Sequence, residues 1–203
     1  LHSFPTRRSS DLRLKWIGID ITHLSIDLIK NRLANEFNLL AKRDYEMIGE
    51  PMDLEGARQL AQNDRYQFQW WALSMVNARP YGDKKKGADG GIDGYIFFLN
   101  KGKNDKALVQ VKSGKVGVKD IRDLKGVLKR EDSPIGVFIT LEEPTRDMIE
   151  EANKEGFYKI QMDPNNYPKI QMITIENLFA GEKPKVPLQV DYRKSAEKVK
   201  KTN

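Results

Sequence analysis

The sequence predicts an α/β fold in which a mixed β-sheet is flanked by helices. Strands alternate with helices after an initial β-hairpin, and this order favours a sheet with helices on both faces. The chain has 203 residues, enough for one well-buried domain, or for one domain and a fragment of another. Because no internal repeat is visible, we expect one main core.

The first strand and helix are expected near the N-terminus. Residues 15–20 (KWIGID) form a short apolar run that ends in Asp20, and apolar side chains recur at helical spacing after Thr22. Residues 45–51 (YEMIGEP) end in a proline and predict a connector, with a domain boundary near residue 45. The N-terminal part is therefore expected to be a strand–helix unit.

Two helices are predicted next, each opened by an aspartate that can cap it. Asp53 and Asp64 precede runs with apolar residues at helical spacing. The second run contains adjacent tryptophans, Trp70 and Trp71. Bases can stack on such side chains, but packing of the broad aromatic faces into the core is the favoured interpretation.

The main sheet is expected from residue 92 onward. A basic, glycine-rich loop at residues 83–91 (DKKKGADGG) precedes a predicted hairpin, a helix, a buried strand, a second helix ended by Gly156, and two short strands. Their predicted ranges are 92–99 and 107–112 for the hairpin strands, 118–128 for the helix, 135–141 for the strand, 148–152 for the second helix, and about 158–162 and 170–175 for the last strands.

Residues suited to catalysis lie at the open end of this hairpin. The start of its first strand and the end of its second lie side by side, so Asp93 and Lys112 can converge although they are distant in sequence. Gln110 and Lys112 share a face because strand side chains alternate, while Val111 points toward the core. An ordinary hairpin ion pair between Asp93 and Lys112 is the alternative interpretation.

Hydrolysis of a phosphodiester bond suits this set of residues. The reaction uses a divalent cation that polarises the phosphate and lowers the pKa of an attacking water. Oxygen atoms that such a cation prefers are available from the Asp93 carboxylate, the Gln110 amide and the Val111 backbone carbonyl. Lys112 would orient or help deprotonate the water and stabilise the transition state. We expect Asp93, Gln110 and Lys112 to be catalytic, with Mg²⁺ or Mn²⁺ as cofactor.

On these residues the chain resembles the Mrr-like branch of the PD-(D/E)XK nuclease superfamily. That branch has a helix before a G-D-G-G-I-D turn and a Q-x-K strand, which appear here as residues 88–93 (ADGGID) and 110–112 (QVK). The match extends over residues 64–179 and includes the strand at 135–140. The resemblance implies a restriction-endonuclease-like fold and a metal-dependent endodeoxyribonuclease whose partner is DNA. A homodimer is compatible with it.

Two departures from that family concern the metal site. Related nucleases often carry a glutamate on the early helix where this chain has Gln69, and Gln110 is also neutral. Asp89 is a candidate accessory carboxylate, with stabilisation of the glycine turn as its equal alternative. A DNA-binding module that positions a methyltransferase without cutting DNA therefore remains open as the alternative function.

Basic side chains near this site are candidate DNA contacts. Lys84, Lys85 and Lys86 precede the strand of Asp93, and Ser113 and Lys115 follow the strand of Lys112. A solvated loop is the equal alternative. The formal net charge is +6, but the last fifteen residues carry +3 and the first twelve carry +1. Overall charge therefore adds little evidence for nucleic-acid binding.

The N-terminus combines two further resemblances. Residues 1–12 match the translation of a common sequencing adapter at every position, so we expect an artefact and a natural protein that extends upstream; an arginine-rich arm is the alternative.

Residues 13–33 resemble the last conserved unit of the amino-group (N4/N6) DNA methyltransferases. In that Rossmann-like family an acid, here Asp20, holds the ribose of S-adenosylmethionine. The family's glycine-rich turn and catalytic loop are missing, so S-adenosylmethionine would bind only an intact upstream methyltransferase.

The expected organisation has four parts. They are an adapter-derived segment (1–12), a methyltransferase fragment (13–44), an Mrr-like nuclease domain (45–188) and a basic disordered tail (189–203). A methyltransferase followed by a nuclease is the layout of a single-chain restriction-modification protein. The absence of cysteine excludes disulfides, thiolate zinc sites and cysteine nucleophiles, and fits a cytoplasmic protein. No apolar run approaches the roughly 20 residues that cross a bilayer, so no membrane partner is expected.

Overall fold

The computed structural model describes residues 15–82, 90–161 and 163–190. Its strands are β1 (Arg79–Pro80), β2 (Gly94–Asn100), β3 (Lys103–Lys112), β4 (Ile135–Thr140), β5 (Phe157–Lys159), β6 (Asn166–Pro168) and β7 (Ile170–Thr174). Its helices are α2 (His23–Phe37), α3 (Leu54–Asn63), α4 (Arg65–Met75), α5 (Val118–Arg130), α6 (Arg146–Asn153) and α7 (Ile175–Phe179). Among these described residues, no helix combines the length and apolar character needed to cross a bilayer.

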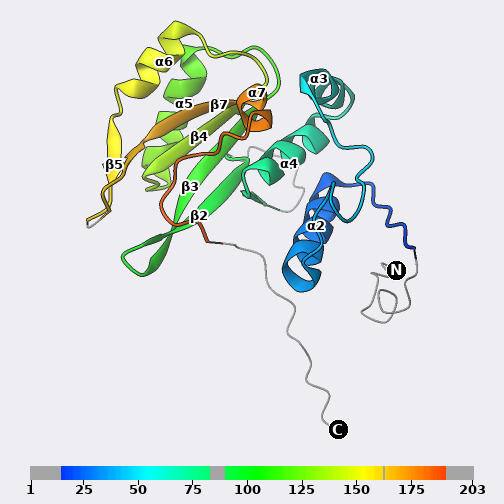
Figure 1. The fold of residues 1–203 in the computed structure, drawn as a ribbon. Coiled ribbons are helices and arrows are strands. Elements are labelled where there is room, and N and C mark those ends of the chain that lie inside the picture. The colour runs from blue at the N-terminus through cyan, green and yellow to red at the C-terminus, as the bar shows by residue number, and fades with distance from the viewer. Residues whose placement is uncertain (1–14, 83–89, 162, 191–203) are drawn as a thin grey trace.

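A five-stranded mixed sheet forms the centre of the fold, as predicted (Figure 1). Its order is β1-β2-β3-β4-β7. Strand β2 is antiparallel to β1 and β3, whereas β3, β4 and β7 run parallel to one another. The hairpin and the alternation of helices with strands were therefore predicted correctly. The carboxyl ends of β3, β4 and β7 meet at one edge of the sheet, where Lys112, Thr140 and Thr174 lie in register.

The core lies on both faces of this sheet. One face packs against α3, α4 and α7 through side chains that include Phe68, Val109 and Val137. The other packs against α5 and α6 through side chains that include Leu108 and Phe138. Because Val109 and Leu108 are consecutive in β3 yet belong to different faces, the strand alternates as an inner strand should.

Two helices begin where the sequence predicted. The Asp53 carboxylate accepts a hydrogen bond from the Gly56 backbone N–H, and the Asp64 carboxylate accepts two in the first turn of α4. Trp71 is buried, and its ring lies against those of Phe68 and Phe179. Core packing of this tryptophan is confirmed, and base stacking on it is excluded by burial.

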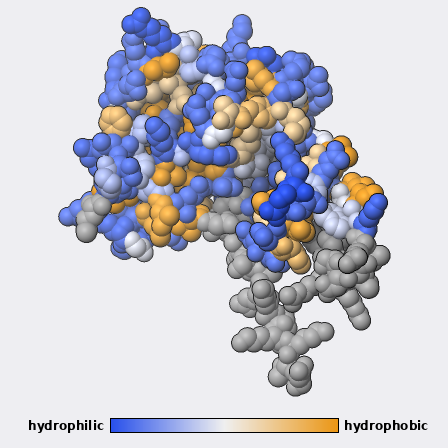
Figure 2. Space-filling model, in the orientation of Figure 1, coloured by the Kyte–Doolittle hydropathy of each residue, from blue (hydrophilic) through white to orange (hydrophobic). Residues whose placement is uncertain are grey.

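The predicted strand at residues 15–20 does not form, although the helix after it does. Thr22 caps α2 by accepting a hydrogen bond from the Ser25 backbone N–H. The preceding segment pairs with no described strand, and Ile17, Ile19 and Ile21 are 90%, 89% and 91% exposed. Hydrophobic residues, in orange, are visible at the right of Figure 2, on the side where Figure 1 shows the N-terminal segment. The prediction failed because a β-strand exists only where a neighbouring strand accepts its backbone hydrogen bonds.

Helix α2 lies against α4 (Figure 1). The contact includes two hydrogen bonds: the Gln67 side-chain oxygen accepts one from the His23 backbone N–H, and its nitrogen donates one to the Ile21 carbonyl. Lys30 and Glu50 form an ion pair at 2.9 Å between α2 and the connector that follows it. The Gln67 side chain thus attaches the start of the N-terminal unit to α4.

The tail predicted to begin at residue 189 is ordered at its start. The Leu188 carbonyl accepts a hydrogen bond from Leu99 N, and Val190 N donates to the Phe97 carbonyl. Residues 188–190 therefore continue the edge of β2 beyond β1, because that edge leaves backbone groups free to pair. The rest of the predicted tail, residues 191–203, lies outside the described residues. The short elements β1, β6 and α7 were not predicted, and β5 pairs with β6 in a separate two-stranded sheet.

Candidate active site

Asp93 lies at the entrance to β2, directly after a two-glycine turn. Gly90 and Gly91 both have positive φ, 61° and 80°, which glycine adopts without strain. The next side chain, Ile92, is buried in the core under α5. The Asp93 backbone N–H then donates to the Val109 carbonyl at 2.9 Å, and the Asp93 carbonyl accepts from Tyr81 N. The backbone of Asp93 is therefore held from both neighbouring strands.

The Asp93 carboxylate reaches the strand that carries the other predicted residues. Its Oδ2 accepts a hydrogen bond from the Val111 backbone N–H at 2.7 Å. In addition, the register of β2 and β3 pairs Gly94, the residue after Asp93, with Val109, the residue before Gln110. The Asp93 carboxylate is thus joined by a hydrogen bond to Val111, the residue that follows Gln110 in β3.

Gln110 is buried, with 4% of its surface exposed, and its amide nitrogen donates to the Gly91 carbonyl. A Cβ built on Gly91 would lie 2.8 Å from that nitrogen and 3.3 Å from a methyl group of Val127 in α5. The side chain of Gln110 therefore lies on the α5 face of the sheet, packed against the glycine turn. The amide oxygen is the remaining polar atom that this side chain can offer to a cation.

Lys112 ends β3 and is half-buried. Val111 packs against the core on the α4 side, so alternation places Gln110 and Lys112 together on the α5 side. The Lys112 carbonyl accepts a hydrogen bond from Leu141 N at 3.1 Å, which ties the strand end to β4. After it, Ser113 is half-buried and Lys115 is exposed, in the loop before α5.

Two of the predicted residues lie on other parts of the fold, and four fall outside the described part of the chain. Gln69 belongs to α4, which covers the opposite face of the sheet. Asp20 accepts hydrogen bonds from the backbone and side chain of Thr22, at the start of α2. Lys84, Lys85, Lys86 and Asp89 lie outside the described residues.

The donor set is poor in charge. Within the described ranges, no three histidine, aspartate or glutamate side chains are grouped so that they could hold a metal ion. Mg²⁺ nevertheless keeps several waters in most proteins and is bound through one or two carboxylates and substrate phosphates. One carboxylate, one amide oxygen and one backbone carbonyl on adjacent strands therefore fit a hydrated Mg²⁺ rather than a metal enclosed by protein.

Sequence reasoning missed Arg130, at the end of α5. Its guanidinium Nη2 donates to the Gly90 carbonyl at 2.6 Å, and its Nε lies 3.2 Å from a carboxylate oxygen of Glu131. No pattern in the sequence indicates this contact, because it depends on where the last turn of α5 lies relative to the turn before β2.

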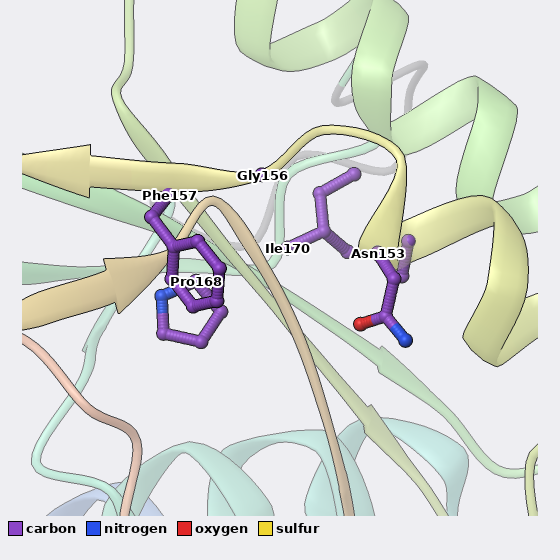
Figure 3. Close-up of a pocket in the computed structure, with 6 residues that line it drawn as sticks. Asn153, Gly156, Phe157, Pro168 and Ile170 are labelled. Atoms are coloured by element: carbon purple, nitrogen blue, oxygen red, sulfur yellow. The ribbon is translucent and has the colours of Figure 1, made fainter.

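A separate cavity of about 300 Å³, drawn in Figure 3, lies near the start of β7. It is lined by Ala152, Asn153, Gly156, Phe157, Pro168 and Ile170. Ile170 begins β7, whereas Lys112 is in register with Thr174, the last residue of β7, through Thr140 of β4. The cavity and the candidate site therefore lie at opposite ends of the parallel strands. None of the lining side chains ionises, so this cavity offers no group for acid–base or metal chemistry.

Comparison with known proteins places this arrangement in a family. A family model described as "Restriction endonuclease" (Mrr_cat) matches residues 60–178. Among solved structures, a similar chain is that of "MspJI Restriction Endonuclease in Complex with 27-mer Oligonucleotide", with 19% identity and a TM-score of 0.46; the match covers 63% of this chain and 29% of that one. None of the curated proteins compared with this chain matches it. Because the family model spans more than half of the sequence, the chain belongs to the Mrr_cat restriction-endonuclease family, a family of DNA-cleaving hydrolases.

Proposed function

We propose that this protein hydrolyses DNA phosphodiester bonds with Mg²⁺ or Mn²⁺ at a site formed by Asp93, Gln110 and Lys112. The observation that carries the proposal is the 2.7 Å hydrogen bond from Val111 N to the Asp93 carboxylate. This bond brings the Asp93 carboxylate to the end of β3, where the Gln110 and Lys112 side chains lie on the same face of the sheet. An exposed ion pair between strands would require neither the buried glutamine nor the tethered glycine turn.

The cation would be held by the Asp93 carboxylate, the Gln110 amide oxygen and the Val111 carbonyl. When bound, it supplies a polarised phosphate and a water of lowered pKa. The Val111 N–H keeps Asp93 oriented, since a charge-assisted hydrogen bond of this length fixes a carboxylate firmly. Burial of Gln110 likewise limits its motion, so both ligands are positioned before the cation arrives.

Lys112 would act on the reacting atoms. Its ammonium group follows directly after the predicted ligands and can orient the attacking water and stabilise the charge that develops on the phosphate. Ser113 and Lys115, in the following loop, and Lys84, Lys85 and Lys86, before β2, would contact phosphates along the DNA. These contacts would fix the position of the duplex without reading its sequence.

The wider context is also part of the proposal. The strand–helix unit before residue 45 would come from an amino-group DNA methyltransferase, and the protein would belong to a restriction-modification system. Asp20 would bind S-adenosylmethionine only within an intact methyltransferase. The nuclease part would act alone or as a homodimer.

A second candidate is a DNA-binding module that does not cut. Neutral side chains at both Gln69 and Gln110 favour it, because they leave the site with one described carboxylate. Such a module would bind DNA with an affinity that falls steeply with salt, and would need no metal ion.

One experiment separates the two candidates. The full chain is incubated with supercoiled plasmid DNA and Mg²⁺, next to the variants Asp93→Asn and Lys112→Met. Matched controls are Asp123→Asn on α5 and Lys103→Met at the far end of β3, which remove the same charges away from the site. Cleavage by the native chain and both controls, with loss in the two site variants, is the expected result. DNA binding without cleavage under all metal conditions would favour the non-cutting module.

A further inference from the structure

We propose that Arg130 is a positioning residue for the site, holding the glycine turn that directs the Asp93 carboxylate toward Val111 and the proposed cation. The inference rests on the proposed function. It begins from the turn itself, which would otherwise be loosely held. Gly90 and Gly91 follow each other with positive φ and carry no side chains that could pack. Two consecutive glycines have the widest conformational freedom of any dipeptide, so their ordered geometry requires external contacts.

Those contacts are supplied by two side chains, one to each carbonyl. Gln110 donates to the Gly91 carbonyl from within the sheet, and Arg130 donates to the Gly90 carbonyl from the end of α5. After them come the buried Ile92 and the backbone hydrogen bond of Asp93. Each residue from 90 to 93 is thus fixed by a named interaction, and Arg130 holds the first of them.

An arginine suits this position better than a lysine. Its Nε faces the Glu131 carboxylate at 3.2 Å while its Nη2 donates to Gly90 at 2.6 Å, so one rigid group serves two acceptors in different directions. Glu131 also lies 3.7 Å from the Lys106 ammonium group on β3. The guanidinium is therefore oriented by a chain of charges that begins on the same strand as Gln110 and Lys112.

The Arg130 guanidinium lies directly against Gly90. A Cβ at Gly90 would lie 2.7 Å from the Arg130 Nη2 atom, closer than non-bonded atoms allow. Positive φ is the reason that both positions favour glycine, because the Arg130 and Gln110 atoms that a Cβ would meet are the ends of side chains that can shift.

The direct test is amide hydrogen exchange, followed by NMR on the metal-free full chain without DNA. The reporter is the Val111 N–H, which the Asp93 carboxylate protects, with Leu108 N–H as an internal reference in the same strand. Arg130→Ala is expected to speed exchange at Val111 on the order of tenfold, the scale of one charge-assisted hydrogen bond. Lys129→Ala, which removes the same charge from the neighbouring exposed position on α5, is expected to leave it unchanged.

Arg130→Lys keeps the charge and tests the fork geometry. A single ammonium group cannot serve Glu131 and Gly90 as the guanidinium does, so faster exchange at Val111 is expected here too. In the cleavage assay, Arg130→Ala is expected to raise the Mg²⁺ concentration for half-maximal rate several-fold while the rate at saturating Mg²⁺ recovers. If Arg130 were purely structural, its removal would lower the rate at saturating Mg²⁺ as well, or would change neither quantity.

Because exchange is measured without metal or DNA, it decides the role of Arg130 even for a chain that does not cut. Unchanged exchange at Val111 in both Arg130 variants would overturn the inference, whatever the cleavage assay shows. Equal acceleration at Val111 and Leu108 would also overturn it, because that result means general loosening of the strand. Acceleration confined to Val111, absent from Lys129→Ala, would support it.

Discussion

Replacing Gln110 by glutamate separates the two roles that the structure gives this side chain. The neutral amide donates a hydrogen bond to the Gly91 carbonyl, and only 4% of the residue is exposed. A carboxylate of the same shape cannot donate when ionised, so it would face the carbonyl with another acceptor. It would, however, be a stronger ligand for a hard cation than the amide oxygen. Gln110→Glu should therefore weaken the metal-free protein and strengthen its response to Mg²⁺.

The size of the effect follows from the lost hydrogen bond. Leaving a buried acceptor unsatisfied costs about 1–3 kcal/mol, and the buried charge adds to this cost. For a chain of this length, 2 kcal/mol corresponds to a fall in Tm of roughly 4–8 °C. A protonated glutamic acid can still donate to Gly91, so burial and this bond raise its pKa in the folded state. Stability is then retained below the unfolded pKa of about 4.3 and lost as the pH rises through the folded pKa.

The assay is urea or thermal unfolding of the full chain at about pH 8, with EDTA and with Mg²⁺. Gln171→Glu is the matched control, because Gln171 is also buried and donates to backbone carbonyls of Pro168 and Lys185, away from the site. Both variants should lose stability in EDTA, and only Gln110→Glu should regain it with Mg²⁺. Native stability of Gln110→Glu in EDTA would refute the hydrogen-bonding role. Equal recovery of both variants would refute the metal-binding role.

Three further outcomes are expected. Asp93→Ala should lower the free energy of unfolding by about 1–3 kcal/mol, because Val111 N–H loses its acceptor, whereas Asp93→Asn keeps an oxygen there and should cost less; equal losses in urea unfolding would contradict this. Burial lowers the pKa of His23; Lys30 lowers it further, and Glu50 and Asp64 oppose the shift. The packing of α2 on α4 should therefore be retained above about pH 6.5 and weaken as the pH falls below it. Amide exchange in α2 that is identical at about pH 7.5 and pH 5.5 would argue against it. Ile17→Ser and Ile19→Ser should leave Tm unchanged, since both side chains are exposed; a clear fall in the melting curve would show a contact that the structure lacks.

The parts of the fold that the sequence predicted are those encoded by neighbouring residues. Asp53 and Asp64 cap their helices through atoms two or three residues away, so the local sequence contains the whole interaction. The hairpin of β2 and β3 is similarly local, and its alternation placed Gln110 and Lys112 on one face.

The parts that were missed depend on distant neighbours. Residues 15–20 have a strand-like pattern, but strand formation requires a partner that no pattern within the segment encodes. Arg130 contacts Gly90 from 40 positions away, and no spacing rule connects the end of a helix to that turn. The donation from Gln110 to Gly91 was equally hidden, because sequence shows an amide but not which of its atoms faces the turn.

The central claim, that Asp93 and Lys112 form a metal-dependent nuclease site, is tested most directly by plasmid cleavage with purified full chain. With Mg²⁺, the native chain and the controls Asp123→Asn and Lys103→Met are predicted to cut. Asp93→Asn and Lys112→Met, and the native chain in EDTA, are predicted to leave the plasmid intact. Cleavage that persists in both site variants at the native rate would contradict the claim.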